Sequence, residues 1–169
     1  ARFHSELWKW ETQSTPSLLS QNPVANSAIW LSDTEQLLYI PLVGDTNPLP
    51  LQLVMWDQGR GEIAYHREFD ESIRLGGLLD DAKSVMLFSG LPYYSRDDAL
   101  EPIKFIVLDT ATGDEKQTIH TDKTLTNASM CDDGQYVVGW LNDAEQSQVW
   151  IWDIETGEIV YSDEWDGVM

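Results

Sequence analysis

The sequence predicts an all-β fold of four-stranded antiparallel sheets that repeat along the chain, with about three complete sheets plus half of another. One marker is a short apolar strand that ends in an aromatic residue or Leu followed by an acid, found at Trp10-Glu11, Trp56-Asp57, Leu108-Asp109 and Trp152-Asp153. The spacings between these strands are 46, 52 and 44 residues, a period typical of repeat architectures. A second marker, a set of turn acids, keeps a matching period of 48 and 52 residues, at Asp33, Asp81 and Asp133. Agreement of two independent markers on one period indicates a true structural repeat.

Within each unit we name the strands a, b, c and d, with the marked strand as c. The first complete unit is predicted to have strands at 28–31, 36–42, 53–57 and 62–69. The second has them at 73–79, 84–88, 105–109 and 115–120. In the third unit, strands a to c are predicted at 124–131, 135–141 and 149–153. These are short β-branched and aromatic runs between Asp/Gly turns, the pattern of successive hairpins, and no capped helical period competes with it.

Composition limits the possible functions. The hydrophobic fraction is 42%, with eight Trp, so the chain can bury a core. No apolar run approaches the roughly 20 residues of a membrane-spanning helix. A net charge of −19 repels phosphate groups, which argues against nucleic acid and membrane partners and favours a basic protein or a cation. High solubility is the simpler explanation of this charge.

With its Asp-Asp-Gly hairpin at 132–134 and its Val149-Trp150-Ile151-Trp152-Asp153 strand, the chain resembles WD-repeat and related bacterial β-propellers. Its repeats are degenerate, because the Trp-Asp pair is kept only at Trp56-Asp57 and Trp152-Asp153 and the Gly-His dipeptide is absent. The resemblance implies a single partial propeller domain over residues 1–169. Its repeat units lie at approximately 7–26 (half a blade), 27–69, 73–120 and 124–164. Since closed rings have about four to eight blades, we expect part of a larger propeller or a half closed by another chain, including a homo-oligomer.

The sequence offers no motif for catalysis or metal binding. The three His lie in separate units, and the chain contains no Gly-rich phosphate loop, His-Glu-x-x-His or Cys-x-x-Cys. A single cysteine, Cys131, allows neither an internal disulfide nor a zinc site of its own. In Asp132-Asp133-Gly134 a calcium loop would place Tyr136 at a ligand position, so these acids are interpreted as turn formers. We expect no catalytic residue, no metal and no cofactor.

The connections between strands b and c give the clearest indication of function. They are long and unlike one another, at 44–50, 89–102 and 142–148, whereas the a–b and c–d turns are short and alike. Variable loops on one rim of a rigid scaffold commonly carry binding. Because Tyr and Arg are enriched at interface centres, Tyr93, Tyr94 and Arg96, with Asp97 and Asp98 beside them, form the predicted partner site. Trp165 is a further candidate anchor.

Three functional interpretations follow. The first is a non-catalytic protein-interaction or scaffold module that binds through the rim of b–c loops. The second is an accessory propeller of a larger enzyme, such as a peptidase, in which it gates or positions substrate. The third is a binder of a small ligand, sugar or calcium. Fold alone cannot choose among them, because propellers have many unrelated functions.

Overall fold

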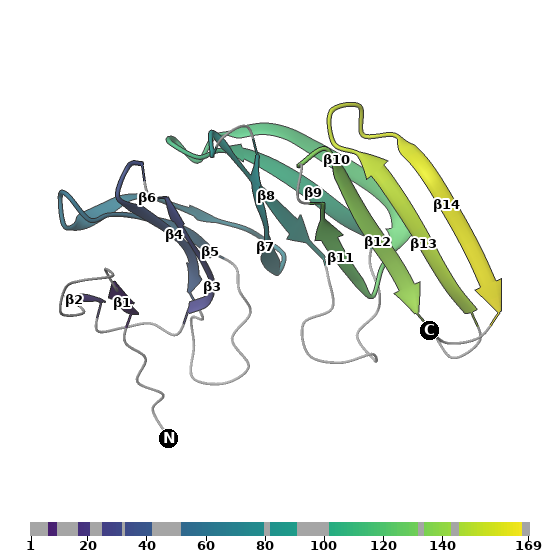
Figure 1. Cartoon of the computed structure of the whole chain (residues 1–169), viewed down its shortest axis with the longest axis horizontal. Helices are drawn as coiled ribbons and strands as arrows, with labels where there is room; N and C mark the ends of the chain where they lie inside the picture. Colours follow the sequence, from purple (N-terminus) through teal and green to yellow (C-terminus); the bar gives the residue numbers. More distant parts are fainter. Residues whose placement is uncertain are drawn as a thin grey trace, which may run out of the picture. The chain divides into compact units, whose positions relative to one another are not determined.

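The described part of the chain consists of strands and turns (Figure 1). The computed structural model describes residues 7–9, 17–20, 25–31, 33–41, 52–79, 82–90, 102–131, 134–142 and 146–166. Side chains are described from Ala28 onward within these ranges, except that of Gln146. These residues include no helix long and apolar enough to cross a membrane.

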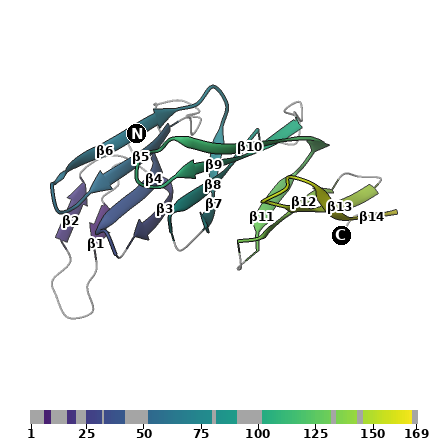
Figure 2. The same ribbon diagram turned by 90° about the horizontal axis from the view of Figure 1, so that it is seen from above.

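Three four-stranded antiparallel sheets follow one another along the chain, each a meander in which consecutive strands are hydrogen-bonded neighbours (Figure 2). Sheet 1 contains β3 (Ala25–Leu31), β4 (Gln36–Pro41), β5 (Gln52–Asp57) and β6 (Glu62–Glu68). Sheet 2 contains β7 (Ile73–Leu79), β8 (Ser84–Ser89), β9 (Pro102–Asp109) and β10 (Glu115–Thr124). Sheet 3 contains β11 (Asn127–Met130), β12 (Tyr136–Asn142), β13 (Gln146–Asp153) and β14 (Ile159–Asp166). A two-stranded sheet of β1 (Leu7–Lys9) and β2 (Ser17–Ser20) precedes them, and the predicted fold class is confirmed.

The chain divides into two compact units, residues 1–70 and 71–169. Sheet 1 belongs to the first unit, together with β1 and β2, and sheets 2 and 3 belong to the second. The single domain expected from the sequence stays a prediction.

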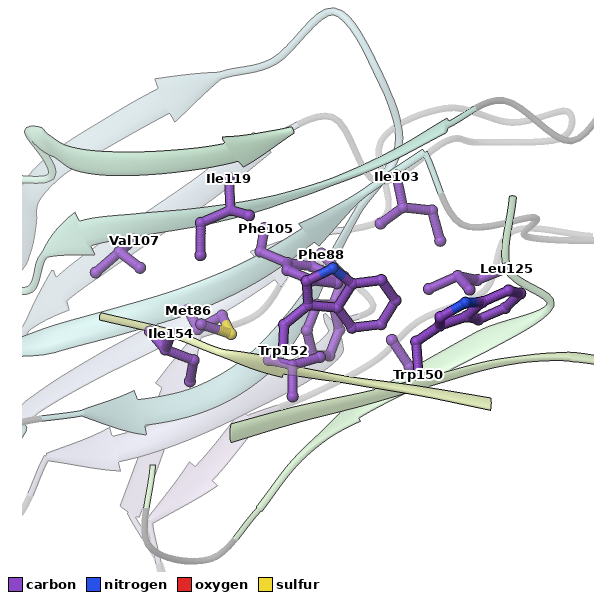
Figure 3. Close-up of a cluster of buried hydrophobic side chains, with 12 residues drawn as sticks. Met86, Phe88, Ile103, Phe105, Val107, Ile119, Leu125, Trp150, Trp152 and Ile154 are labelled. Carbon is purple, nitrogen blue, oxygen red and sulfur yellow. The ribbon is translucent and has the colours of Figure 1, made fainter. Parts of the chain in front are cut away.

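The second unit has a core between its two sheets (Figure 3). Because side chains alternate across a strand, β9 presents Phe105 and Val107 on one face and Ile106 and Leu108 on the other, and all four are buried. Phe105 lies at the centre, in edge-to-face contact with Phe88 of its own sheet and with Trp152 of sheet 3. The core therefore joins sheets 2 and 3 through aromatic side chains.

In the first unit, a smaller cluster covers one face of sheet 1. It consists of Leu37, Tyr39 and Val54, with Trp30 and Trp56 packed against it. Trp56 and Trp152 occupy the same place in their sheets, at the end of strand c. Trp56 is half-buried, whereas Trp152 is only 2% exposed.

The acids that close strand c hold the c–d turns. The Asp109 and Asp153 carboxylates accept hydrogen bonds from the backbone N–H of Thr112 (3.1 Å) and Thr156 (2.8 Å), and Asp57 does the same with Arg60 (2.9 Å). Four residues after each acid stands a glycine with a φ of +68° to +75°, at Gly61, Gly113 and Gly157. A side chain there would be strained, which explains the Asp-x-x-x-Gly pattern.

A repeated backbone bond ties each c–d turn to the a–b turn of its own sheet. The residue after the acid donates its N–H to a carbonyl of the a–b turn, from Gln58 to Glu35, Thr110 to Lys83 and Ile154 to Gln135, at 2.9 to 3.1 Å. The short turns of each sheet therefore lie together at one end. The b–c and d–a connections lie at the other.

Strand bounds differ from the prediction at the b–c connection of sheet 3 and where β10 meets β11. The connection predicted to be long, at 142–148, spans only residues 143–145, because β13 already begins at Gln146 and pairs with β14 from there. The sequence places residues 124–131 in one strand, but Thr124 belongs to β10, where it pairs with Pro102 after an irregularity in register beyond His120. β11 begins only at Asn127. The extension of β10 follows the long neighbouring strand β9, a tertiary pairing that local sequence does not reveal.

Candidate functional site

Most of the predicted partner site lies outside the described residues. Tyr93, Tyr94, Arg96, Asp97 and Asp98 fall in this category. So do the repeat positions Trp10, Asp81 and Asp133. Of the predicted site residues, the structure places Trp165, which is half-buried near the end of β14 and pairs with Ser147 of β13.

Glu71 contacts residues at both ends of the b–c connection of sheet 2, which spans residues 90–101 between β8 and β9. One of its carboxylate oxygens accepts a hydrogen bond of 2.8 Å from the Ser89 hydroxyl, at the end of β8. The other pairs with the Lys104 ammonium, near the start of β9. The backbone adds a bond of 3.2 Å from the Gly90 N–H to the Ser72 carbonyl. Glu71, which precedes β7, thus links the d–a connection to both ends of the long b–c connection.

Charge at this end of sheet 2 favours the ionised form of Glu71. The Lys104 ammonium beside it holds the pKa of the Glu71 carboxyl below its ordinary value, with help from the Ser89 hydroxyl and against the opposing effect of burial. His120, which pairs with Lys104 across β9 and β10, contributes weakly in the same direction. Ser89 is 3% exposed, while the side chains of Lys104 and Glu71 are about one third exposed, at 34% and 32%. Glu71, Ser89 and Lys104 therefore form a partly buried polar cluster, which we call the Glu71 staple.

Sheet 3 has a similar closure at the corresponding end. The Ser147 hydroxyl donates to the Asn142 side-chain oxygen at 3.2 Å, which links the end of β12 to the start of β13. The backbone N–H of Thr126 donates to the Trp140 carbonyl at 2.8 Å and fixes the d–a connection between sheets 2 and 3. Strand β10 leads directly into β11, so these hydrogen bonds of sheet 3 lie on the same rim of the second unit as the Glu71 staple. We call this rim the long-loop rim.

The opposite rim is held by a different set of bonds. The Lys116 ammonium forms an ion pair of 3.1 Å with Asp109 and donates to the Lys83 carbonyl and the Ser84 hydroxyl. The same lysine, with the backbone N–H of Thr112, lowers the pKa of the Asp109 carboxyl. These bonds join the a–b and c–d turns of sheet 2 to each other.

The described side chains form no cluster suited to metal binding or to nucleophilic catalysis. In these ranges, no group of three or more His, Cys, Asp or Glu side chains is arranged to hold a metal ion. His66 on β6 and His120 on β10 are exposed and belong to different units. Ser89 has a carboxylate as hydrogen-bond acceptor, not an imidazole. The polar cluster on the long-loop rim is suited to fixing loop ends.

Solved structures with the same arrangement identify the architecture. The chain matches the Dos1 propeller with a TM-score of 0.61 at 14% identity, covering 94% of this chain and 42% of that one. The fold is that of a β-propeller. A chain of the mitotic checkpoint complex matches with a TM-score of 0.60 at 15% identity, covering 95% and 44%. A chain of Kuenenia stuttgartiensis hydrazine synthase matches with a TM-score of 0.59 at 14% identity, covering 89% and 40%.

These comparisons establish the fold alone. The chain spans 40 to 44% of the length of these propeller proteins. No known protein family matches the sequence, and no curated protein is significantly similar to it. An enzyme, hydrazine synthase, occurs among the matches beside the Dos1 propeller and the mitotic checkpoint complex, so the fold does not decide whether a larger protein of this kind is catalytic.

Sequence reasoning did not find the Glu71 staple. Glu71 lies 18 residues from Ser89 and 33 from Lys104, and none of the three belongs to a motif. The available signal was weak: a Glu in the d–a connection, with a Ser and a Lys at the two strand ends that border the longest b–c connection. Only the antiparallel order β7-β8-β9 brings them together.

Proposed function

We propose that the chain is a non-catalytic protein-interaction or scaffold module that binds a protein partner through the long-loop rim. The observation that carries the proposal is the contrast between the two rims. The short turns are tied down by the same backbone bond in all three sheets. The b–c connections of sheets 1 and 2, at 42–51 and 90–101, are longer than these turns, whereas that of sheet 3 spans only residues 143–145. A rigid scaffold with variable loops on one side is the usual arrangement of a binding surface.

The centre of this surface is the 89–102 connection, with Tyr93, Tyr94 and Arg96 as anchors and Asp97 and Asp98 beside them. The Glu71 staple supports the proposal, because fixing both loop ends reduces the conformational entropy that binding would cost. Trp165 would contribute from the same end of sheet 3. With a net charge of −19, the module favours a basic partner.

The test compares substitutions in the 89–102 connection with one in a short c–d turn. Partner proteins captured from the native cell extract are quantified for the wild type, for Tyr93→Ala/Tyr94→Ala, for Arg96→Ala and for Arg60→Ala. Arg60 is the control, because it lies in the c–d turn of sheet 1 and its side chain is 74% exposed. Loss of an anchor lowers affinity about tenfold or more.

A specific partner retained by Arg60→Ala and lost by both long-loop variants would support the proposal. Equal capture by all four proteins would refute it.

A second candidate is an accessory propeller of a larger enzyme. The match to hydrazine synthase favours it, since that enzyme contains the same fold. In that case the chemistry belongs to another domain, and the long-loop rim would contact that domain. A catalytic domain in the same polypeptide, cross-linked to the rim, would distinguish this from a separate partner.

A further inference from the structure

Strand d lies at one edge of every sheet. Among the described strands, β6, β10 and β14 each have a single hydrogen-bonded neighbour, which is strand c of the same sheet. The edges of β6 and β10 stay unpaired although further described strands follow them in the chain, so an open strand-d edge belongs to the repeated meander itself. In sheet 3 this edge is that of β14, drawn in yellow in Figure 1. An unpaired edge offers a row of backbone N–H and C=O groups to another strand.

The edge of β14 lacks the features that commonly prevent strand pairing. Such features are Lys, Pro and irregular register. β10 contains Lys116 and Lys123 and has two irregularities in its register, and β6 contains Arg67. β14 runs over eight residues without Lys, Arg or Pro, and its one register shift lies at its start, opposite Trp152. Of the three strand-d edges, that of β14 is therefore the most open to a further strand.

The first residues of β14 expose apolar side chains. Among the described residues, the exposed large hydrophobic side chains are Ile63, on β6, and three in succession on β14, Ile159, Val160 and Tyr161. Val160 is 54% exposed and Tyr161 is 49% exposed. A strand that paired with this part of β14 would remove some of their apolar surface from water, which favours apolar residues in that strand.

The second half of β14 is acidic. Asp163, Glu164 and Asp166 are exposed, and no Lys or Arg follows Lys123 in the sequence. Opposite charges on neighbouring strands stabilise pairing, whereas like charges directly opposite each other destabilise it. The acids therefore favour a strand that carries Lys or Arg, and they disfavour the β14 edge of a second copy of this chain.

One hydrogen bond shows which backbone groups point to the free edge. The Glu164 N–H donates to the Asp163 carboxylate at 2.9 Å, so it is directed away from β13. Backbone groups of alternate residues point to the same side of an antiparallel strand, and the N–H groups of Ser162 and Asp166 therefore share this direction. The side chains of these alternate residues also share one face of the sheet. A strand added at this edge would thus meet Glu164 and Asp166 on the same face.

We propose that the free edge of β14 binds an extended segment of a partner protein, which adds to sheet 3 as an antiparallel strand with Lys or Arg beside Glu164 and Asp166. Its apolar residues lie beside Ile159 and Tyr161. In this mode of recognition backbone hydrogen bonds supply the affinity, and alternate side chains supply the specificity. The added strand continues sheet 3 in its own plane, so it leaves free the faces on which sheets stack. The edge is distinct from the 89–102 connection, and the inference does not depend on the long-loop rim.

The experiment uses a capped peptide as long as β14, eight residues, with Lys at alternate positions of its first half and Val and Thr in its second half. One matched peptide has Glu in place of Lys. Another keeps the Lys sequence but has N-methyl groups on the backbone nitrogens that would face β14. Binding to the whole chain is measured by calorimetry and mapped by NMR.

We expect the Lys peptide to bind and to shift the amide signals of Ser162 and Glu164. The Glu peptide should bind more weakly because of like-charge repulsion. The N-methylated peptide keeps the charge of the Lys peptide but cannot donate backbone hydrogen bonds to β14, so it should not bind.

Ser162→Pro separates strand addition from attraction between charges. Proline is tolerated in an edge strand where its missing N–H would face solvent, so pairing with β13 is kept. This variant should lose binding of the Lys peptide. His66→Pro is the matched control and should keep it, since His66 is exposed and lies opposite Val54 on β6 as Ser162 lies opposite Trp150. Thermal unfolding checks that both variants fold, and the N-methylated peptide decides the question if Ser162→Pro does not.

The charge of β14 is tested by a pair of double variants. Glu164→Gln/Asp166→Asn should lower the affinity for the Lys peptide about two- to tenfold, the size expected of two cross-strand ion pairs. Glu155→Gln/Glu158→Gln is the control, because it removes the same charge from exposed positions of the same sheet that lie outside β14. The control should lower the affinity by less.

Three results would overturn the proposal: binding of the N-methylated peptide as tight as that of the Lys peptide, equal affinity for the Lys and Glu peptides, or unchanged binding by a folded Ser162→Pro variant. Association of the chain with its own copies, seen by light scattering and abolished by Ser162→Pro, would also overturn it, because a second copy would then be the occupant. Tyr93→Ala/Tyr94→Ala should leave peptide binding unchanged, which separates this proposal from that of the long-loop rim.

Discussion

Phe105 of β9 and Trp152 of β13 meet edge to face across sheets 2 and 3, with ring centroids 5.2 Å apart and planes inclined by 78°. Both residues belong to the strand that recurs in every unit, yet they point in opposite directions along the stack. Phe105 faces the following sheet and Trp152 faces the preceding one. One contact therefore links two successive repeats.

Truncating Phe105 should remove this link. Phe105→Ala is expected to lower the free energy of unfolding by about 3–5 kcal/mol, because the side chain is fully buried and leaves a cavity. Val160→Ala is the control, since Val160 is 54% exposed, and its effect should stay within about 0.5 kcal/mol. Urea unfolding of both variants measures the difference. Equal destabilisation would mean that Phe105 does not anchor the core.

Gly139 on β12 should tolerate no side chain. A Cβ there would lie 2.4 Å from Leu125 and 2.8 Å from the Trp152 ring. Gly139→Ala is expected to cost about 1–3 kcal/mol through overpacking. Gly59→Ala is the matched control, because its Cβ would meet Asp57 at an ordinary 3.4 Å. Comparable melting temperatures for the two variants would contradict the packing described for sheet 3.

The a–b turns offer a reciprocal pair of substitutions. Ala82 has a φ of +68° and Gly134, in the corresponding turn of sheet 3, has a φ of +69°. Ala82→Gly should relieve strain and raise stability by about 1 kcal/mol, or about 2–4 °C in melting temperature. Gly134→Ala should lower stability by more, since its Cβ would also press on Leu79 at 3.0 Å. Changes of the same sign in both variants would show that these turns are not equivalent.

The Glu71 staple should give a pH-dependent contribution to stability. Its folded pKa lies below the unfolded value, so the contribution is fully present above about pH 4.5, the ordinary value for Glu, and is lost as pH falls through the folded pKa. Glu71→Gln should cost up to about 1 kcal/mol at pH 7, a modest effect because the pair is partly exposed. The difference between wild type and variant should shrink as the pH falls below 4.5. Glu62→Gln, an exposed change on β6, is the control for removal of a carboxylate.

A difference that stayed constant from pH 7 to below pH 4 would show that the Glu71 charge is not what stabilises the pair with Lys104. Denaturant unfolding at each pH provides the measurement.

Much of the fold was predictable because its signals are local. Apolar runs ending in an acid and the Asp-x-x-x-Gly turns repeat with the period of one sheet, so the four-strand units follow from the sequence. The end of β10 was not predictable, because Thr124 pairs with Pro102 only through the sheet. The Glu71 staple escaped for the same reason, since its partners are brought together by the meander and by no spacing in the chain.

The predicted site residues also fall into two groups, those on a strand and those in a long connection. Trp165 could be placed on β14 because cross-strand pairing fixes its neighbour, Ser147. Tyr93, Tyr94 and Arg96 belong to a long connection whose composition indicates binding but whose geometry is not set by local periodicity. Their role stays a prediction.

The measurement that tests the central claim most directly is site-specific photo-cross-linking in the native cell. A photoreactive side chain replaces Asp98 in the 89–102 connection in one protein and Arg60 in the c–d turn of sheet 1 in another. The account predicts a discrete protein adduct from position 98 and none from position 60. An adduct from position 60 alone, or identical adducts from both, would contradict binding through the long-loop rim.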